Sequence, residues 1–215
     1  MKTTVQARNW LRRMAVSLAF VTALAAALNG LASGPTPAQI VQDTAGNILE
    51  EIDARRAEFQ ADPEALKRLV REQLLPMLDQ EYSAKLILGR QGRGQPADKV
   101  RDFGQALSTV LTDRYSTGLL RFQSRDQMEI LPPNPNDNER LTRVRTRVKL
   151  ENGGSAPVDY AFRKTDDGWK VFDVTVEGVS YVLTFRNQLA PKVAAEGIEK
   201  VTADLLAGQI QVSGS

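Results

Sequence analysis

The sequence of 215 residues contains neither cysteine nor histidine. The absence of cysteine excludes disulfides, thiol nucleophiles and cysteine-ligated zinc sites. The absence of histidine excludes every catalytic triad that relies on an imidazole base. Without disulfides, the stability of the fold has to come from the burial of apolar side chains. We expect no metal site and no cofactor.

Acidic residues are missing from the N-terminal segment, residues 1–32, which carries four basic residues: Lys2, Arg8, Arg12 and Arg13. An apolar run over residues 14–28 and several small residues follow, a three-part pattern typical of a secretory signal peptide. We predict cleavage near Ala32, which leaves residues 33–215 as a single domain. An uncleaved membrane anchor is the alternative, because residues 14–32 approach the roughly 20 apolar residues that span a bilayer.

The net charge changes sign if that segment is removed. The full sequence has 28 Lys and Arg against 26 Asp and Glu, a net charge of +2, and without residues 1–32 the net charge is −2. A nucleic-acid-binding face needs clustered basic residues that neutralise phosphates. The composition therefore predicts no nucleic-acid partner.

The first half of the predicted mature chain has the apolar spacing of helices. Thr36 with Gln39 is a helix-start signal, and Asp62 followed by proline is another. Pro76 must end or kink the second helix, because proline lacks a backbone donor and clashes with the preceding turn. A third helix is predicted to end at Gly89, and a fourth to begin at Pro96.

From about residue 124 onward the apolar period changes from 3.6 to 2 residues. One strand is predicted before a proline-rich loop at residues 132–139, and three more follow, joined by hairpins. A last helix is predicted around residues 198–206. Helices followed by a meander predict an α+β fold in which helices pack on one face of a curved antiparallel sheet.

The last predicted strand, which begins at Trp169, has two apolar faces. In a regular strand Phe172, Val174 and Val176 point one way, while Trp169 and Val171 point the other. Only 6% of the residues are aromatic, so a curved sheet under helices can leave a hollow that side chains do not fill. The pattern fits either an apolar cavity or a well-packed aliphatic core.

Few residues suggest catalysis. Asp173, in the middle of this strand, is the best candidate for an acid with an altered pKa, but we favour a structural role, either facing the rim of the sheet or bonding a neighbouring backbone group. The "GRQGRG" segment at residues 89–94 lacks a following Lys-Ser/Thr pair and does not follow a strand, so it is no phosphate loop. We predict that the chain is not an enzyme. A small-molecule enzyme using Asp173 and a structural adaptor without ligand remain alternatives.

Three segments resemble the MlaC family, also called toluene-tolerance proteins, the periplasmic phospholipid shuttles of Gram-negative bacteria. They are "WKVFDVTVEGVSYVLTFRNQL" at residues 169–189, "REQLLPMLDQEYSAKLILG" at residues 71–89 and "DFGQALSTVLTDRYSTGL" at residues 102–119. The signal peptide, the strand order and the length agree with the family as well. The resemblance extends over residues 37–210.

The resemblance implies a cone similar to the NTF2-like fold, with a deep apolar pocket that takes acyl chains and leaves the lipid head group near solvent. It also implies that the protein shuttles phospholipid in the periplasm between an outer-membrane lipoprotein complex and an inner-membrane ABC transporter complex, maintaining outer-membrane lipid asymmetry.

Periodicity suggests which side chains could line such a pocket. The helices would contribute Leu74, Leu78, Phe103 and Leu107, and the sheet side would contribute Val144, Val148, Val158, Tyr160, Val174, Val176, Val179 and Val182. The opposite strand face is basic, with Arg143, Arg145, Arg147, Lys149 and Arg163. That face is either a surface for an acidic partner or anionic head groups, or a solvated strand face.

Overall fold

A computed structural model of the chain describes residues 34–121, 127–133, 138, 140–150 and 153–213. The predicted signal peptide and most of the predicted proline-rich loop lie outside these residues. The chain divides into two units after Gly34, and all the helices and strands described below belong to the second unit.

Six α-helices occur in the described residues: α2 (Pro37–Ala61), α3 (Pro63–Leu74), α4 (Gln80–Leu88), α5 (Ala97–Ser116), α6 (Tyr181–Glu196) and α7 (Ile198–Leu206). Helix α2 begins as predicted, because the Thr36 hydroxyl accepts a hydrogen bond from the Gln39 N–H at 3.3 Å and Gln39 Oε1 accepts one from the Thr36 N–H at 2.8 Å. Short 3₁₀ turns follow α3 (η2, Leu75–Met77), α4 (η3, Gly89–Gly92) and α5 (η4, Thr117–Arg121). The predicted break at Pro76 is therefore confirmed, since this residue lies in η2.

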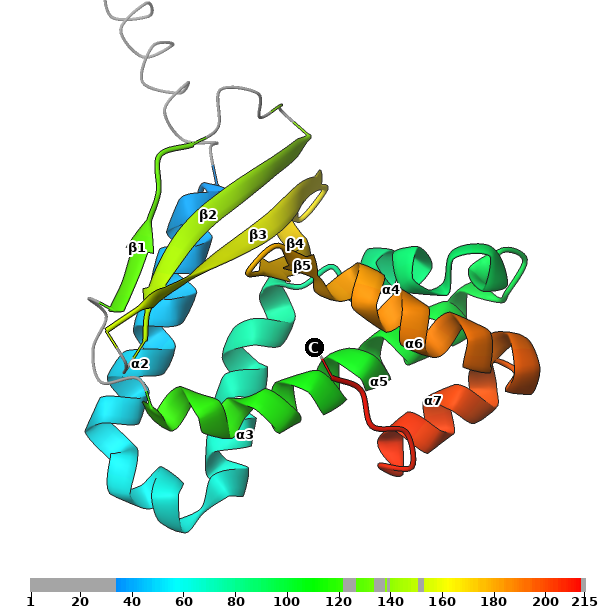
Figure 1. Cartoon of the computed structure of the whole chain (residues 1–215), viewed down its shortest axis with the longest axis horizontal. Helices are drawn as coiled ribbons and strands as arrows, with labels where there is room; N and C mark the ends of the chain where they lie inside the picture. The colour runs from blue at the N-terminus through cyan, green and yellow to red at the C-terminus, as the bar shows by residue number, and fades with distance from the viewer. Residues whose placement is uncertain (1–33, 122–126, 134–137, 139, 151–152, 214–215) are drawn as a thin grey trace, which may run out of the picture. The chain divides into compact units, whose positions relative to one another are not determined.

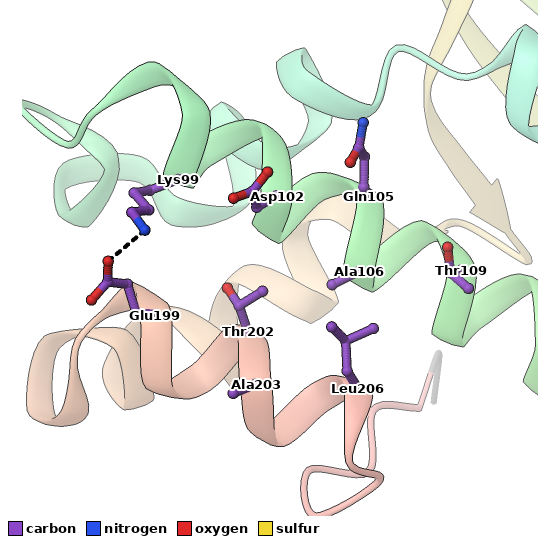
Figure 2. A pocket seen from close by; sticks show the side chains of 9 residues that line it. All are labelled: Lys99, Asp102, Gln105, Ala106, Thr109, Glu199, Thr202, Ala203 and Leu206. Carbon is purple, nitrogen blue, oxygen red and sulfur yellow. Dashed lines mark ion pairs between the residues drawn. The ribbon is translucent and has the colours of Figure 1, made fainter.

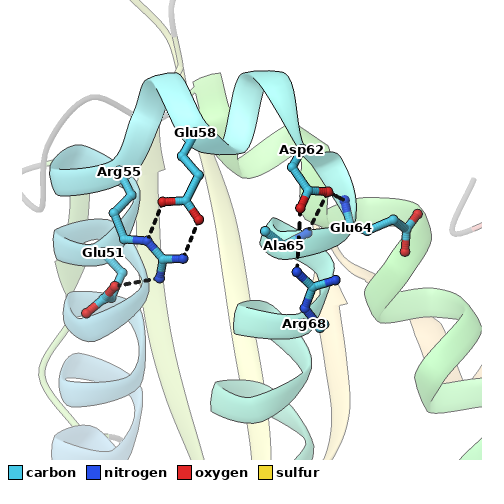
Figure 3. A network of polar contacts seen from close by, with 7 residues as sticks. All are labelled: Glu51, Arg55, Glu58, Asp62, Glu64, Ala65 and Arg68. Atoms are coloured by element: carbon cyan, nitrogen blue, oxygen red, sulfur yellow. Dashed lines mark hydrogen bonds and ion pairs between the residues drawn. The ribbon is translucent and has the colours of Figure 1, made fainter.

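Helix α2 is kinked at Arg55, whose φ of −125° and ψ of 24° are not helical. The Arg55 guanidinium bridges the kink by donating hydrogen bonds to Glu51 and Glu58 (Figure 3). The predicted cap at Asp62 is also confirmed, because its carboxylate accepts hydrogen bonds from the N–H groups of Glu64 and Ala65 at the start of α3. The chain thus reverses between α2 and α3 with its exposed helix ends satisfied.

Five strands form one antiparallel sheet in sequential order: β1 (Met128–Ile130), β2 (Leu141–Lys149), β3 (Ser155–Thr165), β4 (Gly168–Val176) and β5 (Val179–Ser180) (Figure 1). In the register Val144 lies opposite Tyr160, and Tyr160 lies opposite Val174. These three side chains share one face of the sheet. Helix α2 packs against β2, and α4 and α6 pack against β4. The predicted α+β fold is confirmed.

Strand β4 contains a β-bulge that changes the predicted side-chain directions. Asp173 pairs with Ala161 but Val171 pairs with Phe162, so Phe172 is an extra residue without a partner. The insertion puts Trp169 and Val171 on the same face as Val174. The prediction that they point to opposite faces is therefore wrong, and Trp169, Val171 and Val174 gather on the inner face, the one that α2 covers.

The extra residue of the bulge serves to attach α4 to the sheet. The Phe172 ring packs edge-on against Tyr82, with 5.3 Å between the ring centroids, and its carbonyl accepts a hydrogen bond from the Ser83 hydroxyl at 2.8 Å. Asp79, the N-cap of α4, donates its N–H to the Val171 carbonyl at 2.7 Å. The Asp79 carboxylate also pairs with Arg163 of β3.

The segment after β5 also differs from the prediction. The sequence predicts Val182 on the sheet side, but it lies in the first turn of α6. Ser180 caps this helix by accepting a hydrogen bond from the Leu183 N–H at 3.1 Å. The buried residues Val182, Phe185 and Leu189 follow helical spacing, so packing of this face outweighs the strand preference of the β-branched residues.

Candidate functional site

An apolar cavity of about 260 Å³ lies between α2, η2 and the inner face of the sheet. Its walls are formed by Val41, Thr44, Ala45, Ile48, Leu49, Leu74, Met77, Leu78, Leu119, Gln127, Met128, Val148, Tyr160, Val171 and Val174. Among the described residues of this lining, the polar side-chain groups are those of Thr44, Gln127 and Tyr160. We call this space the main cavity. Its described residues can exclude water from an apolar guest and include no charged group to bind a polar one.

A second, smaller cavity of about 130 Å³ lies where α4, α5 and α6 approach β4. Leu78, Val171 and Val174 line both cavities. These three side chains therefore form a wall between the two spaces. A movement of this wall would join them into one longer apolar cavity.

Two polar side chains of the inner face, Tyr160 and Thr146, are uncharged. Burial raises the pKa of Tyr160 to about 12, so its phenol stays protonated at physiological pH. Thr146 is completely buried, and its hydroxyl donates a hydrogen bond to the Val158 carbonyl at 2.7 Å. Among the residues that the structure describes, the lining of the main cavity therefore contains no general base.

Asp173, the candidate for catalysis, forms structural hydrogen bonds at the start of α6. Its carboxylate accepts hydrogen bonds from the Val182 N–H at 3.0 Å and from the Ser180 hydroxyl at 2.6 Å. The preferred structural interpretation is confirmed by these bonds. In the described residues no three metal-ligating side chains come close enough to hold an ion. None of the helices described has the length and hydropathy needed to span a membrane.

The twelve residues predicted to line a pocket are divided by the structure into three groups. The main cavity is lined by five of them, Leu74, Leu78, Val148, Tyr160 and Val174. The second cavity adds Leu107 and Val182. Neither lining includes the other five: Phe103, Val144, Val158, Val176 and Val179.

Those five residues lie in three kinds of environment. Phe103 is fully buried in the core between α4, α5, α6 and α7, and Val144 is buried in the cluster on the inner face of the sheet. Val158 and Val176 pair with each other across β3 and β4. Val179 is 49% exposed.

Sequence reasoning missed the contribution of α2. Val41, Ala45, Ile48 and Leu49 form much of one wall of the main cavity. Their helical spacing is visible in the sequence, but spacing alone does not say which surface a helix covers. The contact between α2 and β2 supplies that information.

Most residues of the basic strand face form ion pairs or hydrogen bonds with other residues of this chain. Arg143 pairs with Asp159 at 3.6 Å, and Arg147 pairs with Glu129 at 3.6 Å. Arg145 donates a hydrogen bond to the Pro132 carbonyl at 2.6 Å. Since Arg163 also pairs with Asp79, four of the five predicted basic residues have partners in the fold.

A larger hollow of about 500 Å³ lies on the surface between α5 and α7 (Figure 2). Lys99 and Glu199 form an ion pair of 2.6 Å at one end, and Asp102 and Thr202 add further polar groups. Leu206 borders the same hollow and is 62% exposed. This open, polar hollow cannot remove an apolar guest from water, so the main cavity is the better candidate for a binding site.

A model of the family described as "MlaC protein" matches residues 42–207. The chain belongs to the MlaC family. This membership confirms the resemblance found in three segments of the sequence, and the matched range includes every residue of the main cavity except Val41.

Two relatives agree with this assignment. Toluene tolerance protein ttg2D of Pseudomonas putida is 26% identical over 178 residues, which cover 81% of each protein. The intermembrane phospholipid transport system binding protein MlaC of Haemophilus influenzae is 24% identical over 149 residues, which cover 67% of this chain and 69% of that protein.

The fold also has a solved counterpart. A phospholipid-binding protein from Ralstonia solanacearum, solved in complex with a phospholipid at 1.53 Å, superposes with a TM-score of 0.65 at 20% sequence identity. The match covers 77% of this chain and 96% of that one. The helices and sheet described above therefore form an arrangement that is found in another protein.

Proposed function

We propose that the chain is a phospholipid carrier that holds acyl chains in its main cavity. The observation that carries this proposal is the lining of that cavity, in which side chains from α2, η2 and four strands face one another with no charged group among the described residues. Support also comes from the names of its relatives, one an intermembrane phospholipid transport system binding protein and one a phospholipid-binding protein.

We further propose that both cavities take part. A volume of about 260 Å³ is below the roughly 300–1,000 Å³ of sites for drug-sized ligands. Two acyl chains therefore require the walls to move apart. Met77 and Met128 suit such movement because methionine is unbranched and adaptable. Displacement of Leu78 would open the second cavity to one chain.

The energetics favour exchange with a membrane. Two acyl chains with about thirty buried methylenes gain some 24 kcal/mol on leaving water, at about 0.8 kcal/mol each. A bilayer offers nearly the same gain, so transfer between membrane and cavity is close to balanced. A carrier of this kind loads and unloads without supplying energy, and the direction of transport comes from its partners.

These properties fit a role in the periplasm. We propose that residues 1–32 are a cleaved signal peptide and that the single domain over residues 33–215 shuttles phospholipid between an outer-membrane lipoprotein complex and an inner-membrane ABC transporter complex. Such traffic would maintain the lipid asymmetry of the outer membrane. Binding without chemistry is sufficient for this role, so the proposal requires no catalytic residue.

Native mass spectrometry of protein exported and purified from a Gram-negative host tests the proposal. We expect a mass increment of one diacyl phospholipid per chain, and lipid identification after denaturation. Protein that carries no lipid, and takes none up from phospholipid vesicles, would contradict the proposal and favour the adaptor without ligand. Turnover of a small molecule that is lost in Asp173→Asn would instead favour the enzyme.

A further inference from the structure

Three arginines form a basic patch at the end of α4 and on α6. Arg90 lies in η3, Arg93 follows this turn, and Arg186 lies on α6. All three are exposed, and within the described ranges their guanidinium groups form no hydrogen bond or ion pair. They border two adjoining surface hollows of about 330 and 460 Å³, both of which Arg90 and Arg186 line.

The surrounding sequence contains no acidic residue that could neutralise the patch locally. Residues 82–97, which include Arg90 and Arg93, contain no Asp or Glu, and neither do residues 178–195, which include Arg186. The remaining basic residue that lines these hollows, Lys85, pairs with Glu81. The patch thus contrasts with the strand face, whose arginines have partners within the chain.

The position of Arg186 depends on a glycine. A Cβ atom added at Gly89 would lie 2.8 Å from Arg186 Nη2 and 3.0 Å from its Cζ. The guanidinium therefore rests against the backbone at the end of α4. Gly89 also has a φ of +55°, which other residues rarely adopt. The close contact limits the freedom of Arg186 and brings it toward the turn that carries Arg90.

We propose that this basic patch is a docking surface for an acidic segment of a partner protein. A guanidinium fork pairs with a carboxylate through two parallel hydrogen bonds, and the hollows between the arginines can receive Asp or Glu side chains. Leu183 is 58% exposed and lies one turn before Arg186 on the same face of α6, where it adds an apolar contact.

An anionic membrane surface fits these features less well. Sites for anionic lipid head groups typically cluster about four to eight basic residues. The patch has three unpaired ones, and a flat bilayer does not fill two hollows. The patch residues do not line either apolar cavity, so this inference does not depend on the proposal of lipid transport.

The test uses a synthetic helical peptide with glutamates in successive turns, and the same peptide with glutamine in their place. Calorimetry should detect binding of the glutamate peptide to the wild-type protein, weakening as salt increases, and none of the glutamine peptide. The variant Arg90→Glu/Arg93→Glu/Arg186→Glu should bind at least about tenfold more weakly. Nuclear magnetic resonance should show the Nε–Hε signals of these three arginines shifting in the wild-type protein.

The matched control is Arg101→Glu/Arg114→Glu/Arg140→Glu, which changes three other exposed residues without ion pairs in the described part of the chain. It should retain wild-type affinity, although its net charge changes equally. Arg93→Glu alone, in an exposed turn, provides a milder variant whose affinity should fall about threefold if the triple variant does not fold.

Two outcomes would overturn the inference. One is equal affinity of the wild-type protein and the patch variant for the glutamate peptide. The other is a wild-type protein that does not bind the glutamate peptide but binds phosphatidylglycerol vesicles, and not phosphatidylcholine vesicles, through the patch. That result would make the patch a membrane site. The lipid content of the patch variant, measured separately, should equal that of the wild-type protein. This measurement tests the docking patch independently of the proposed lipid transport.

Discussion

The carboxylate of Asp173 accepts a hydrogen bond from the backbone N–H of Val182 at 3.0 Å, so strand β4 caps the helix that follows it. The second carboxylate oxygen accepts a hydrogen bond from the Ser180 hydroxyl at 2.6 Å. The N–H groups of a first helical turn have no partner within the helix. The acid that the sequence offers for catalysis therefore supplies one of these missing partners.

Replacement of this carboxylate should lower stability. We expect Asp173→Ala to reduce the free energy of unfolding by about 1–2 kcal/mol, the usual effect of losing a helix cap. Asp173→Asn should lose less, because its amide oxygen can still accept the Val182 N–H. Urea denaturation followed by circular dichroism measures both effects. Unchanged stability in Asp173→Ala would mean that the cap is not important.

The close approach of α4 and α5 requires a glycine. A Cβ atom added at Gly104 would lie 2.5 Å from the Gln80 carbonyl oxygen. We expect Gly104→Ala to lower the free energy of unfolding by about 1–3 kcal/mol, because overpacking outweighs the helix propensity that alanine adds. Gly118→Ala is the control, since a Cβ at Gly118 meets no atom within 4 Å. A similar loss in both variants would contradict the explanation.

The stability should depend on the protonation of Tyr160. Its pKa is raised by burial from 10.0 to about 12, so the folded state holds the phenolic proton more firmly than the unfolded state. This contribution is complete below pH 10 and is lost as pH rises through about 12. By that pH the wild-type protein should have lost about 2 kcal/mol more of its unfolding free energy than Tyr160→Phe has lost.

Ultraviolet absorbance of tyrosinate provides an independent measurement of the same effect. The difference between the titrations of the wild-type protein and Tyr160→Phe isolates one phenol among the four tyrosines. We expect that difference to appear near pH 12 in the folded protein. A difference centred at the ordinary tyrosine pKa would show that Tyr160 is accessible to water.

Local sequence signals account for most of the elements. Thr36 with Gln39 and Asp62 mark helix starts through hydrogen bonds within one turn, and Pro76 acts through its own ring. These causes are local, so the sequence contains them completely. The strands and hairpins were predictable for the same reason, since alternation and turn residues lie close together in the chain.

The bulge and helix α6 depend on contacts between distant residues. Phe172 is a bulge residue because Tyr82 and Ser83 of α4 hold its ring and carbonyl. Nothing in the composition of β4 marks that position. The sequence contains a weak signal for helix α6, the helical spacing of Val182 and Phe185, but the β-branched residues before it favour a strand. For the cavity, the sequence identified apolar faces but not which faces meet.

A charge in the wall between the two cavities should prevent lipid binding. Val174 lines both cavities, so Val174→Glu would place an unpaired carboxylate against the acyl chains. We expect loss of co-purified phospholipid in native mass spectra. Val179→Glu is the matched control, because Val179 is 49% exposed and lines neither cavity. Normal lipid content in a folded Val174→Glu variant would remove this wall from the proposed site.

Filling the main cavity without adding charge tests whether lipid binding needs this space in a protein that still folds. Ala45 lines this cavity from α2 and is half-buried, so the ring in Ala45→Trp can occupy the hollow with apolar atoms. We expect a melting temperature near or above that of the wild-type protein, together with much less bound phospholipid. Ala54→Trp, at an exposed position of the same helix, should keep its lipid. If Ala45→Trp folds with a full complement of lipid, the acyl chains must lie elsewhere, because the indole and the ligand cannot share a space of about 260 Å³.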